Sequence, residues 1–448
     1  MDQLTSLLNQ LNGVVWGPPM LVILGAVGVY LSFGLRFLPW RRIPYAFRLL
    51  VSSESGARGE IPPFQALMTA LSATIGTGNI AGVATAIALG GPGAVFYMWL
   101  IALVGMATKY AEAVCAVHFR ETDNSGQYVG GPMYYLKNGV GERFPRLGKG
   151  LAVSFAIFGA IAAFGIGNGT QIHSMADVLS TDFQVPKMVT GAVVAILVGF
   201  VVLGGVSRIG NIAGKLVPVM VVLYIGGAVT VIAINASAVP AAFALIISSA
   251  FNPAAAAGGF AGAAVAAAIR FGVARGVFSN ESGLGSAAIA HGAARTNSPV
   301  RQGHIAMLGT FIDTIVICTL TALCIITSGA WMSGENGAPL TALAFGSSFS
   351  GGNYVVTIAL AVFAFTTIIG WSYYGERCWQ YLLGEGSVVI YRVLWVIAVF
   401  SFSSMKIDFI WTLSDTLNGL MAVPNLIGLI ILGPLVFRLT REYNQESN

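Results

Sequence analysis

Long apolar stretches separated by short polar segments dominate the sequence. Most of these stretches are about 20 residues long, the length that an α-helix needs to cross the hydrocarbon core of a bilayer. They predict an all-α, polytopic membrane protein with about eleven transmembrane helices. The predicted spans are residues 14–38, 64–89, 92–118, 150–178, 187–205, 209–234, 259–291, 302–329, 353–378, 387–403 and 407–438.

Composition supports the membrane assignment. The chain has 448 residues, of which 56% are hydrophobic and 9% charged, whereas soluble domains contain about 25% charged residues. A net charge of +5 fits basic loops beside a membrane better than nucleic-acid binding, so we expect a lipid bilayer and no nucleic acid as partner. The absence of an HExxH motif, a nucleophile–base pair and a phosphate loop argues against an enzyme, and we expect no tightly bound organic cofactor.

Basic residues predict the orientation of the chain. The loops 36–60 and 119–149 are rich in arginine and lysine, whereas the loops at the other ends of the spans contain almost none. The positive-inside rule therefore places the N-terminus outside the cell membrane and the C-terminus in the cytoplasm. This orientation requires an odd number of spans, so one helix is expected over 407–438 despite Pro424 and Pro434. Short helices on the external face are expected at 238–250 and 340–349.

One span carries small and polar residues at its centre. The run Ala73-Thr74-Ile75-Gly76-Thr77-Gly78-Asn79 interrupts the stretch 64–89. Glycine weakens a helix by roughly 1 kcal/mol relative to alanine, and backbone opened in lipid must find other partners or line a wet cavity. The two halves of a broken helix present free N–H groups and free C=O groups side by side, which suits an anion and a cation together. The run thus predicts an ion-coupled transporter of a small amino acid.

A second broken span indicates an internal repeat. The stretch 259–291 is interrupted at Gly276-Val277-Phe278-Ser279-Asn280-Glu281-Ser282-Gly283-Leu284-Gly285, and it enters the membrane from the opposite side. Two inverted units that each begin with a broken helix predict a five-plus-five inverted repeat. The expected division of the single transporter domain 1–448 is an extra N-terminal helix at 14–38, a first repeat at 64–234 and a second repeat at 259–438.

The first break predicts where an amino acid and an ion would bind. Its free N–H groups, near Thr77, Gly78 and Asn79, are expected to take the carboxylate. Its free C=O groups lie near Ser72 and Ile75. In span 353–378, the hydroxyls of Thr366 and Thr367 and the Phe363 carbonyl would complete an oxygen-lined sodium site. The alternatives are glycine packing at the break and threonine hydroxyls that bond only their own helix.

Other polar and aromatic residues are candidates for the substrate pocket. Phe278 is expected to wall the substrate, and Ser279 and Asn280 to bind the ion or the amine. Gln171 and Trp371 are expected near the side-chain end, although Gln171 is equally suited to a helix–helix hydrogen bond. The full expected substrate set is Ile75, Gly76, Thr77, Gly78, Asn79, Gln171, Phe278, Ser279, Asn280, Thr367 and Trp371.

Intramembrane charges have several open roles. Glu281 is expected to lock the broken helix, carry a proton, or pair with Arg275 or Arg270, since buried charges are usually paired. Asp313 has no evident partner and suits a structural or ion-path role. Lys109 and Glu112 are expected to pair or to reach the membrane surface.

Several motifs resemble one transporter family. The runs Thr77-Gly78-Asn79-Ile80-Ala81-Gly82-Val83-Ala84-Thr85-Ala86-Ile87, Gly130-Gly131-Pro132-Met133-Tyr134-Tyr135, Ser279-Asn280-Glu281-Ser282-Gly283-Leu284-Gly285 and Gly370-Trp371-Ser372-Tyr373-Tyr374-Gly375-Glu376 are similar to signatures of the alanine or glycine:cation symporter family. The resemblance covers roughly residues 15–440. It implies the leucine-transporter fold of the amino acid–polyamine–cation group, and symport of alanine or glycine with sodium, sometimes with protons.

The resemblance also implies roles for individual residues. By this likeness the Thr77 and Gly78 amides would hold the carboxylate, and Asn79, Thr74 and Ser279 fall where the fold holds a second ion. Phe278, Gln171 and Trp371 would line the side-chain end. The implied sodium ligands are Ser72, Ile75, Phe363, Thr366 and Thr367. A proton-coupled permease of the same fold, with Glu281 as carrier, is the alternative function, and an ion channel is disfavoured because no charged rings are visible.

Overall fold

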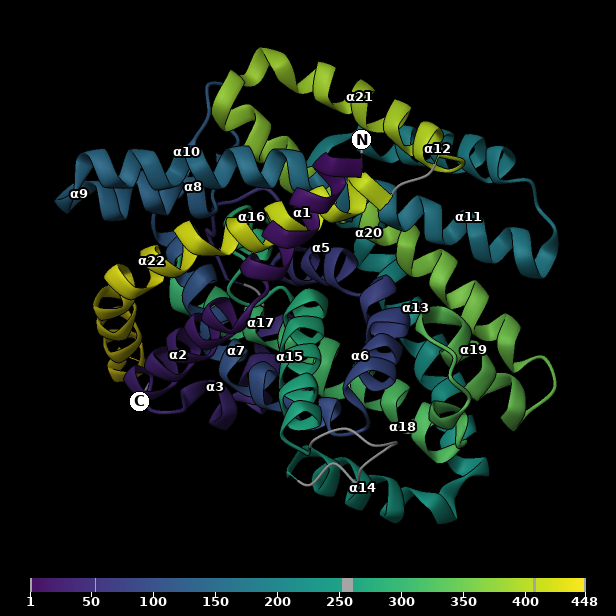
Figure 1. The fold of residues 1–448 in the computed structure, drawn as a ribbon. Helices are drawn as coiled ribbons and strands as arrows, with labels where there is room; N and C mark the ends of the chain where they lie inside the picture. The colour runs from purple at the N-terminus through teal and green to yellow at the C-terminus, as the bar shows by residue number, and fades with distance from the viewer. Residues whose placement is uncertain (1, 53, 252–260, 406–407, 447–448) are drawn as a thin grey trace.

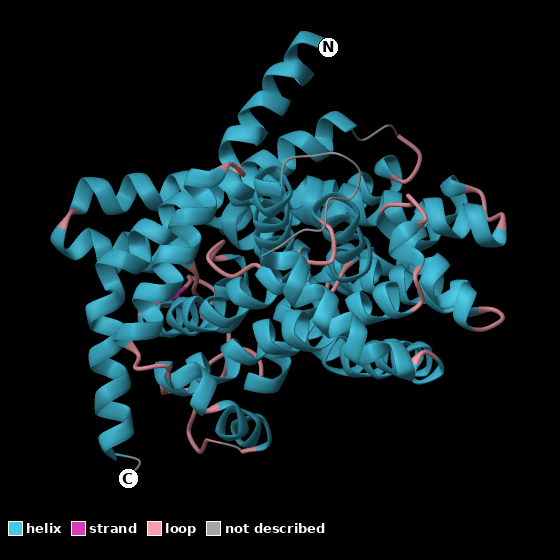
Figure 2. Cartoon of the chain, turned by 60° about the horizontal axis from the view of Figure 1, so that its bottom comes forward, coloured by secondary structure: helices cyan, strands magenta, loops and turns pink. Residues whose placement is uncertain are grey.

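The computed structural model describes residues 2–52, 54–251, 261–405 and 408–446. Almost all of this chain is helical, as Figures 1 and 2 show. The strands β1 (Glu121–Thr122) and β2 (Tyr128–Val129) form a two-stranded antiparallel sheet in one loop. The predicted all-α fold class is confirmed.

Helices of the first part of the chain alternate long spans with short connectors. They are α1 (Asp2–Val15), α2 (Pro18–Gly34), α3 (Leu38–Arg41), α4 (Ile43–Val51), α5 (Pro63–Thr74), η1 (Gly78–Gly82), α6 (Val83–Gly90), α7 (Ala94–His118), α8 (Pro132–Tyr135), η2 (Leu136–Val140), α9 (Gly141–Arg143), α10 (Pro145–Ala162), η3 (Ala163–Gly169), α11 (Thr170–Phe183), α12 (Lys187–Val202), α13 (Gly205–Ile234), η4 (Ala236–Ala238) and α14 (Val239–Phe251).

The second part repeats this pattern. Its helices are α15 (Ala261–Asn280), α16 (Ser286–Gly292), α17 (Pro299–Thr310), η5 (Phe311–Cys318), α18 (Thr319–Thr327), η6 (Ala330–Met332), α19 (Gly337–Ser348), α20 (Gly352–Leu383), η7 (Glu385–Ser387), α21 (Val388–Phe402) and α22 (Asp408–Glu446). The first residues of the predicted spans 259–291 and 407–438 lie outside the described residues.

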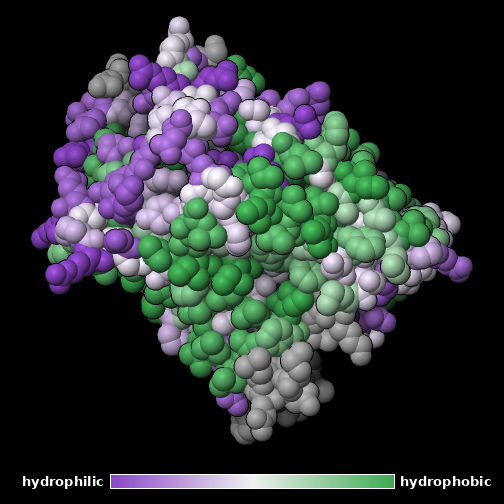
Figure 3. All heavy atoms as spheres, turned by 90° about the horizontal axis from the view of Figure 1, so that it is seen from above, coloured by the Kyte–Doolittle hydropathy of each residue, from purple (hydrophilic) through white to green (hydrophobic). Residues whose placement is uncertain are grey.

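Apolar surface surrounds the helices as a membrane requires. Within the described residues, eight helices are long and apolar enough to cross a bilayer, and a ninth span is the bent pair α5 and α6. Figure 3 shows a broad hydrophobic surface with hydrophilic atoms gathered towards its ends. Because nothing in a bilayer can replace backbone hydrogen bonds, such a surface demands continuous helices except where protein covers a break.

Two helix boundaries differ from the sequence prediction, and one predicted long helix is found as expected. Residues 14–38 are not one helix, because α1 and α2 meet at Trp16 and Gly17 and α2 ends at Gly34. From Asp408 onward, the predicted single helix at 407–438 is found as α22, which contains Pro424 and Pro434 and changes direction along its length (Figure 1). The second break is shorter than predicted, since α15 continues through Asn280 and only 281–285 are non-helical.

Packing brings the two broken spans to the centre of the molecule. The first broken helix, α5, contacts α13 and α20, while α15 of the second contacts α7 and α6. Helix α20 also contacts α10, α11 and η3, so it borders both the first break and the α10–α11 span. In Figure 1, α10 and α11 run nearly end to end across the upper part of the molecule.

Candidate functional site

The first break lies between α5 and η1, where the span bends by 54°. The Asn79 side chain closes the bend, because its Oδ1 accepts a hydrogen bond from the Gly76 amide at 2.9 Å. Within the described chain, the amides of Thr77 and Gly78 donate no hydrogen bond. Two N–H groups are thus left over at the positive end of a helix, which is the arrangement that binds carboxylates.

The carbonyl side of the break contacts α20. The Thr367 hydroxyl lies 3.3 Å from the Ile75 carbonyl and 2.9 Å from the Phe363 carbonyl. Three oxygens from two helices therefore meet at one point, and neutral oxygens of this kind are the ligands of hard cations. The point is buried, with Thr367 2% exposed and Ile75 fully covered.

The other two predicted sodium ligands are placed differently. The Ser72 hydroxyl donates to the Thr69 carbonyl at 2.7 Å, and a Cβ on Gly370 would lie 2.6 Å from its oxygen, so Ser72 packs directly on α20. The Thr366 hydroxyl bonds the Phe363 carbonyl at 2.9 Å and contacts the Met220 sulfur of α13. Thr367 thus contacts the break itself, whereas Thr366 reaches it only through a shared carbonyl.

Gln171 lies at the same break. Its Nε2 donates to the Thr77 hydroxyl at 3.3 Å and to the Ile166 carbonyl at 3.1 Å. Its Oε1 is buried and has no hydrogen-bond partner among the described residues. A Cβ on Gly76 would lie 2.6 Å from the Thr367 hydroxyl and 3.4 Å from this Oε1, so the space beside Gly76 is narrow.

The two broken spans touch at Gly78. A Cβ at this position would lie 3.3 Å from the Ser279 Cα and 3.4 Å from the Phe278 ring. Phe278 is half-buried and Ser279 is buried. The structure therefore brings Phe278 to the first break, and a Cβ at Gly78 would require its neighbours to shift by a few tenths of an ångström.

Trp371 joins α20 to the second break. Its Nε1 donates to the Glu281 carboxylate at 3.0 Å, and the Ser286 hydroxyl donates to the same side chain. Gly167 of η3 packs on Trp371 so closely that a Cβ would overlap the tryptophan. Glu281 accordingly bonds Trp371 and Ser286, and the alternative expectation of a pair with Arg275 or Arg270 is not seen.

The second break spans 281–285, and all five of its amides donate hydrogen bonds. Residues Glu281, Gly283 and Gly285 have φ of 56°, 89° and 82°, the left-handed region that favours glycine. Glu112 of α7 accepts hydrogen bonds from the Gly283 and Gly285 amides at 3.0 and 3.1 Å. This carboxylate also accepts from Asn425 of α22 at 2.7 Å.

Asn280 belongs to this second network rather than to the first break. Its Oδ1 accepts from the Ser282 amide at 2.9 Å and its Nδ2 donates to the Thr314 hydroxyl at 3.0 Å. Both ends of the amide are therefore occupied. The structure does not bring Asn280 to the group formed by Thr77, Gln171 and Phe278.

Asp313 connects the two broken spans. It is fully buried in η5 and accepts from Asn79 at 2.7 Å, from Ser279 at 2.8 Å and from Thr314 at 2.7 Å. Asn79 and Ser279 therefore both donate hydrogen bonds to Asp313. The Thr74 hydroxyl instead donates to carbonyl groups of its own helix. A carboxylate that accepts from both broken helices fixes their relative position.

Lys109 of α7 is a buried cation. It is 2% exposed, its ammonium has no hydrogen-bond partner in the described part of the chain, and it acts electrostatically on Glu112, Glu281 and Asp313. Lys109 and Glu112 do not reach the membrane surface, because both side chains are buried. They interact electrostatically but share no hydrogen bond, since Glu112 bonds the second break. The site therefore combines three carboxyl groups with one ammonium.

A vestibule leads to the first break from one side. This cavity of about 530 Å³ lies between η1, α11, α19 and α20 and ends at Thr77. Its polar lining includes Asp177, Asp182 and Thr357, of which Asp182 and Thr357 hydrogen bond to each other. The cavity thus reaches Thr77, one of the two residues with a free amide at the first break.

The opposite end of the same broken span is closed. Backbone hydrogen bonds join the segment before α5 to the segment after α16: Ile61 donates to Ala293 at 3.2 Å, Arg295 to Ile61 at 2.7 Å and Thr296 to Arg58 at 3.0 Å. We call these contacts the backbone clasp. Arg120 reinforces it through the carbonyls of Ala294 and Thr296.

Comparison with known proteins gives the same picture. A sequence model described as the sodium:alanine symporter family matches residues 1–448. The sodium/alanine symporter AgcS of Methanococcus maripaludis is 48% identical, with 98% of this chain and 97% of that protein covered. The chain belongs to the sodium:alanine symporter family.

Further relatives show the breadth of this family. An uncharacterized transporter of Haemophilus influenzae is 47% identical, with 98% of this chain and 96% of the relative covered. The probable sodium/glutamine symporter GlnT of Bacillus subtilis is 36% identical, with 97% and 90% covered. The family resemblance predicted from the motifs is confirmed, and the protein is a secondary amino acid transporter and not an enzyme.

Solved structures confirm the fold. MhsT in complex with L-phenylalanine superimposes with a TM-score of 0.52 at 15% identity, covering 86% of this chain and 99% of that one. An Eremococcus coleocola manganese transporter in complex with an aromatic bis-isothiourea substituted compound gives a TM-score of 0.53 at 14% identity, with 87% and 89% covered. This member of the family therefore has the leucine-transporter fold of a multi-pass membrane protein.

Proposed function

We propose that this symporter moves a small neutral amino acid, alanine or glycine, into the cell together with sodium by alternating access. One observation carries the proposal: at the first break, the unbonded amides of Thr77 and Gly78 lie beside the carbonyl of Ile75, which Thr367 contacts. An amino acid and a sodium ion need these two kinds of group side by side.

The substrate carboxylate binds the amides and the ion binds the oxygens. Sodium binds where the Thr367 hydroxyl oxygen meets the Ile75 and Phe363 carbonyls, with Ser72 and Thr366 next to it. The ion then holds α5 against α20. This fixes the direction of the Thr77 and Gly78 amides, so that sodium and substrate strengthen each other's binding by the same factor.

Small side chains are selected by the walls of the break. Gly76 faces Thr367 and Gln171, and Gly78 faces Phe278, with almost no free space at either glycine. A missing methylene changes discrimination by only about 1–3 kcal/mol, so larger amino acids must be excluded sterically. The relative named AgcS supports alanine, but the relative named GlnT indicates that membership of the family alone does not define the size of the side chain.

The vestibule and the backbone clasp support alternating access. Substrate enters through the vestibule to Thr77 while the clasp keeps the other end of α5 closed. The basic loops 36–60 and 119–149 lie at the clasp end, so the vestibule faces the exterior, with the N-terminus outside and the C-terminus in the cytoplasm. Opening the clasp would then release both solutes inside.

Uptake in proteoliposomes tests this proposal. Labelled alanine should accumulate when external sodium exceeds internal sodium, and replacing sodium by choline should abolish accumulation. Unlabelled glycine should compete, whereas leucine should not. Accumulation that is unchanged in choline would contradict sodium coupling.

Proton coupling is the second candidate, and the buried carboxyl groups favour it. Glu281 bonds Trp371 and Ser286, and Asp313 accepts from both broken spans, so either could carry a proton between the two sides. Accumulation of alanine driven by an inward pH gradient in sodium-free buffer would support this alternative. Accumulation only with sodium would exclude it.

A further inference from the structure

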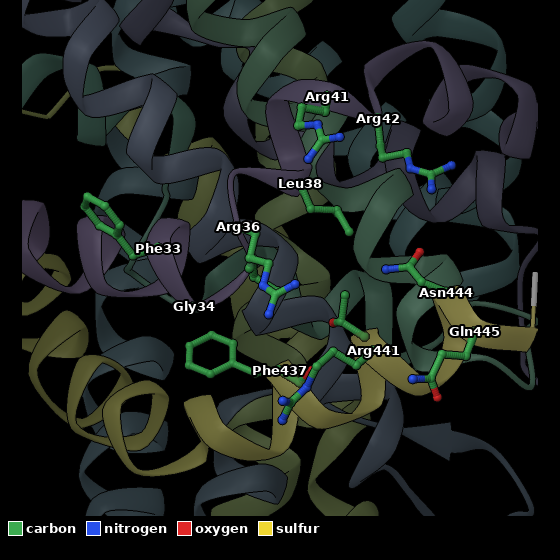
Figure 4. Close-up of a pocket in the computed structure, with 12 residues that line it drawn as sticks. Phe33, Gly34, Arg36, Leu38, Arg41, Arg42, Phe437, Arg441, Asn444 and Gln445 are labelled. Carbon is green, nitrogen blue, oxygen red and sulfur yellow. The ribbon is translucent and has the colours of Figure 1, made fainter. Parts of the chain in front are cut away.

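A basic cavity lies at the C-terminal end of α2. It has a volume of about 600 Å³ and is enclosed by the end of α2, the turn into α3 and α4, and the last turns of α22. Its polar lining includes four arginines, Arg36, Arg41, Arg42 and Arg441, which we call the arginine cradle. Figure 4 shows the three arginines of the N-terminal segment facing Arg441, Asn444 and Gln445 of α22 across the cavity.

Close packing holds the two walls of the cradle together. The Phe437 ring covers Gly34 so tightly that a Cβ there would overlap it, and the Tyr30 and Phe437 rings lie 5.5 Å apart. After Gly34 the chain turns through Arg36 and Phe37, with φ of 53° and 56°. The Phe37 amide donates to the Ser32 carbonyl at 2.9 Å, which fixes this turn and with it the position of Arg36.

Among the described residues, no carboxylate balances the charge of the cradle. No acidic residue lines the cavity among the described residues. Arg42 lies over the Tyr45 ring at 5.5 Å and Arg441 donates to the Phe437 carbonyl at 3.3 Å, but neither contact neutralises charge. The ion pair next to it, Arg438 with Glu442 at 3.9 Å, involves none of the four arginines.

The cradle opens beside the lipid-facing surface. Phe33 lines the cavity and is 65% exposed, which suits contact with acyl chains. Trp40, 39% exposed, donates from Nε1 to the Leu103 carbonyl at 2.9 Å, and tryptophans of this type mark the boundary between lipid and water. By the positive-inside rule this boundary is the cytoplasmic one, where anionic lipids attract basic residues.

We propose that the arginine cradle binds the phosphate headgroup of an anionic phospholipid, with an acyl chain lying along Phe33. Arginine is suited to this role because its planar guanidinium donates two parallel hydrogen bonds to a phosphate. A bound phosphate would link Arg36 of the N-terminal segment to Arg441 of α22. The site is remote from the breaks, so its occupation should depend on neither sodium nor amino acid.

Thermal unfolding of the full-length protein in detergent tests this inference. Phosphatidylglycerol should raise the melting temperature, whereas phosphatidylcholine and inorganic phosphate should not. The double variant Arg36→Gln/Arg441→Gln should bind phosphatidylglycerol about thirtyfold more weakly, because each basic residue near a membrane contributes about fivefold. Arg146→Gln, which removes an exposed arginine elsewhere in the basic loops, should keep the wild-type shift.

Each other outcome overturns the inference. An equal shift with inorganic phosphate would show a free-anion site, and an equal shift in the double variant would place the lipid elsewhere. No shift with phosphatidylglycerol would mean that the cradle holds no lipid. If the double variant is not monodisperse, the single variants Arg36→Gln and Arg441→Gln replace it in the test. Each should show a smaller but measurable loss of phosphatidylglycerol binding.

Discussion

The two broken spans use their opened backbone in different ways. At the first break, the Thr77 and Gly78 amides have no partner in the described chain, and Thr77 lines the vestibule. At the second break, the Gly283 and Gly285 amides are bonded by Glu112. A broken helix is therefore not by itself a binding site, because only the break whose groups remain free can exchange ligands.

The second break is held in one conformation by hydrogen bonds to a carboxylate. Hydrogen bonds to a charged group contribute about 1.5–3 kcal/mol each, and Glu112 accepts three of them. The first break depends instead on Asn79, whose side chain bonds Gly76 and Asp313. We infer that the first break changes with ligand while the second one holds its shape.

The largest effect is expected from Gly76→Ala. The new Cβ would lie 2.6 Å from the Thr367 hydroxyl, which occupies the proposed sodium and substrate space. Overpacking costs about 1–3 kcal/mol, so sodium-driven alanine uptake should fall about a hundredfold, with the protein still monodisperse in detergent. Uptake kinetics in proteoliposomes measure this.

Gly82→Ala is the matched control for that variant. Gly82 lies at the end of η1, the turn that follows Gly76, but a Cβ there would meet nothing within 4 Å. Uptake should stay within about twofold of the wild type. Equal losses of uptake in both variants would mean that uptake depends on the conformation of this segment rather than on the space beside Thr367.

Glu112→Gln tests whether the hydrogen bonds of Glu112 hold the second break in one conformation. Glutamine keeps one acceptor oxygen but removes the charge that binds the Gly283 and Gly285 amides, so about 2 kcal/mol of stability should be lost. The melting temperature should drop by several degrees, and uptake should fall roughly thirtyfold with the apparent affinity for alanine nearly unchanged.

The exposed Glu142 of α9 provides the control as Glu142→Gln, which should behave as wild type. A wild-type melting temperature in Glu112→Gln would show that the second break does not need this carboxylate. A changed alanine affinity with normal stability would instead assign Glu112 to substrate binding and remove the contrast between the breaks.

Gln171→Ala should weaken substrate binding more than ion binding. Gln171 bonds the Thr77 hydroxyl and leaves its Oε1 free. We expect a tenfold higher KM for alanine, about 1.4 kcal/mol, with the sodium half-saturation unchanged. Gln127→Ala, in an exposed turn, serves as the control. An unchanged KM would assign Gln171 to helix–helix contact alone.

The smallest effect is expected from Thr366→Ala. Its hydroxyl contacts Met220 and bonds the Phe363 carbonyl, whereas Thr367 also reaches Ile75. Thr366→Ala should therefore raise the sodium half-saturation by about threefold, and Thr367→Ala by about tenfold or more. Equal effects, or the reverse order, would contradict the placement of the ion beside Ile75.

Much of this architecture could be predicted from local sequence. The length of the apolar stretches predicts the membrane spans, and the glycines and polar residues at 75–79 predict the first break. Both predictions succeed because these effects are local in sequence. The prediction that the second break begins at Gly276 was wrong. A Cβ at this position would lie 2.8 Å from Ile101. That glycine allows α15 to pack on α7 and does not break the helix, so Phe278 to Asn280 remain helical.

Partners distant in sequence could not be predicted. Asp313 meets Asn79 and Ser279, and Glu112 meets Gly283, across 34 to 234 residues of chain. Hydrophobic periodicity contains no information on such pairs, and the folded packing alone brings them together. A buried acid in an apolar span was the available signal, and it indicated importance without indicating the partner.

Reciprocal binding tests the central claim most directly. Calorimetry should show that sodium tightens alanine binding by the same factor, about tenfold or more, as alanine tightens sodium binding, and that Thr367→Ala reduces both factors together. Alanine affinity that is the same in sodium and in choline would contradict a shared site at the first break.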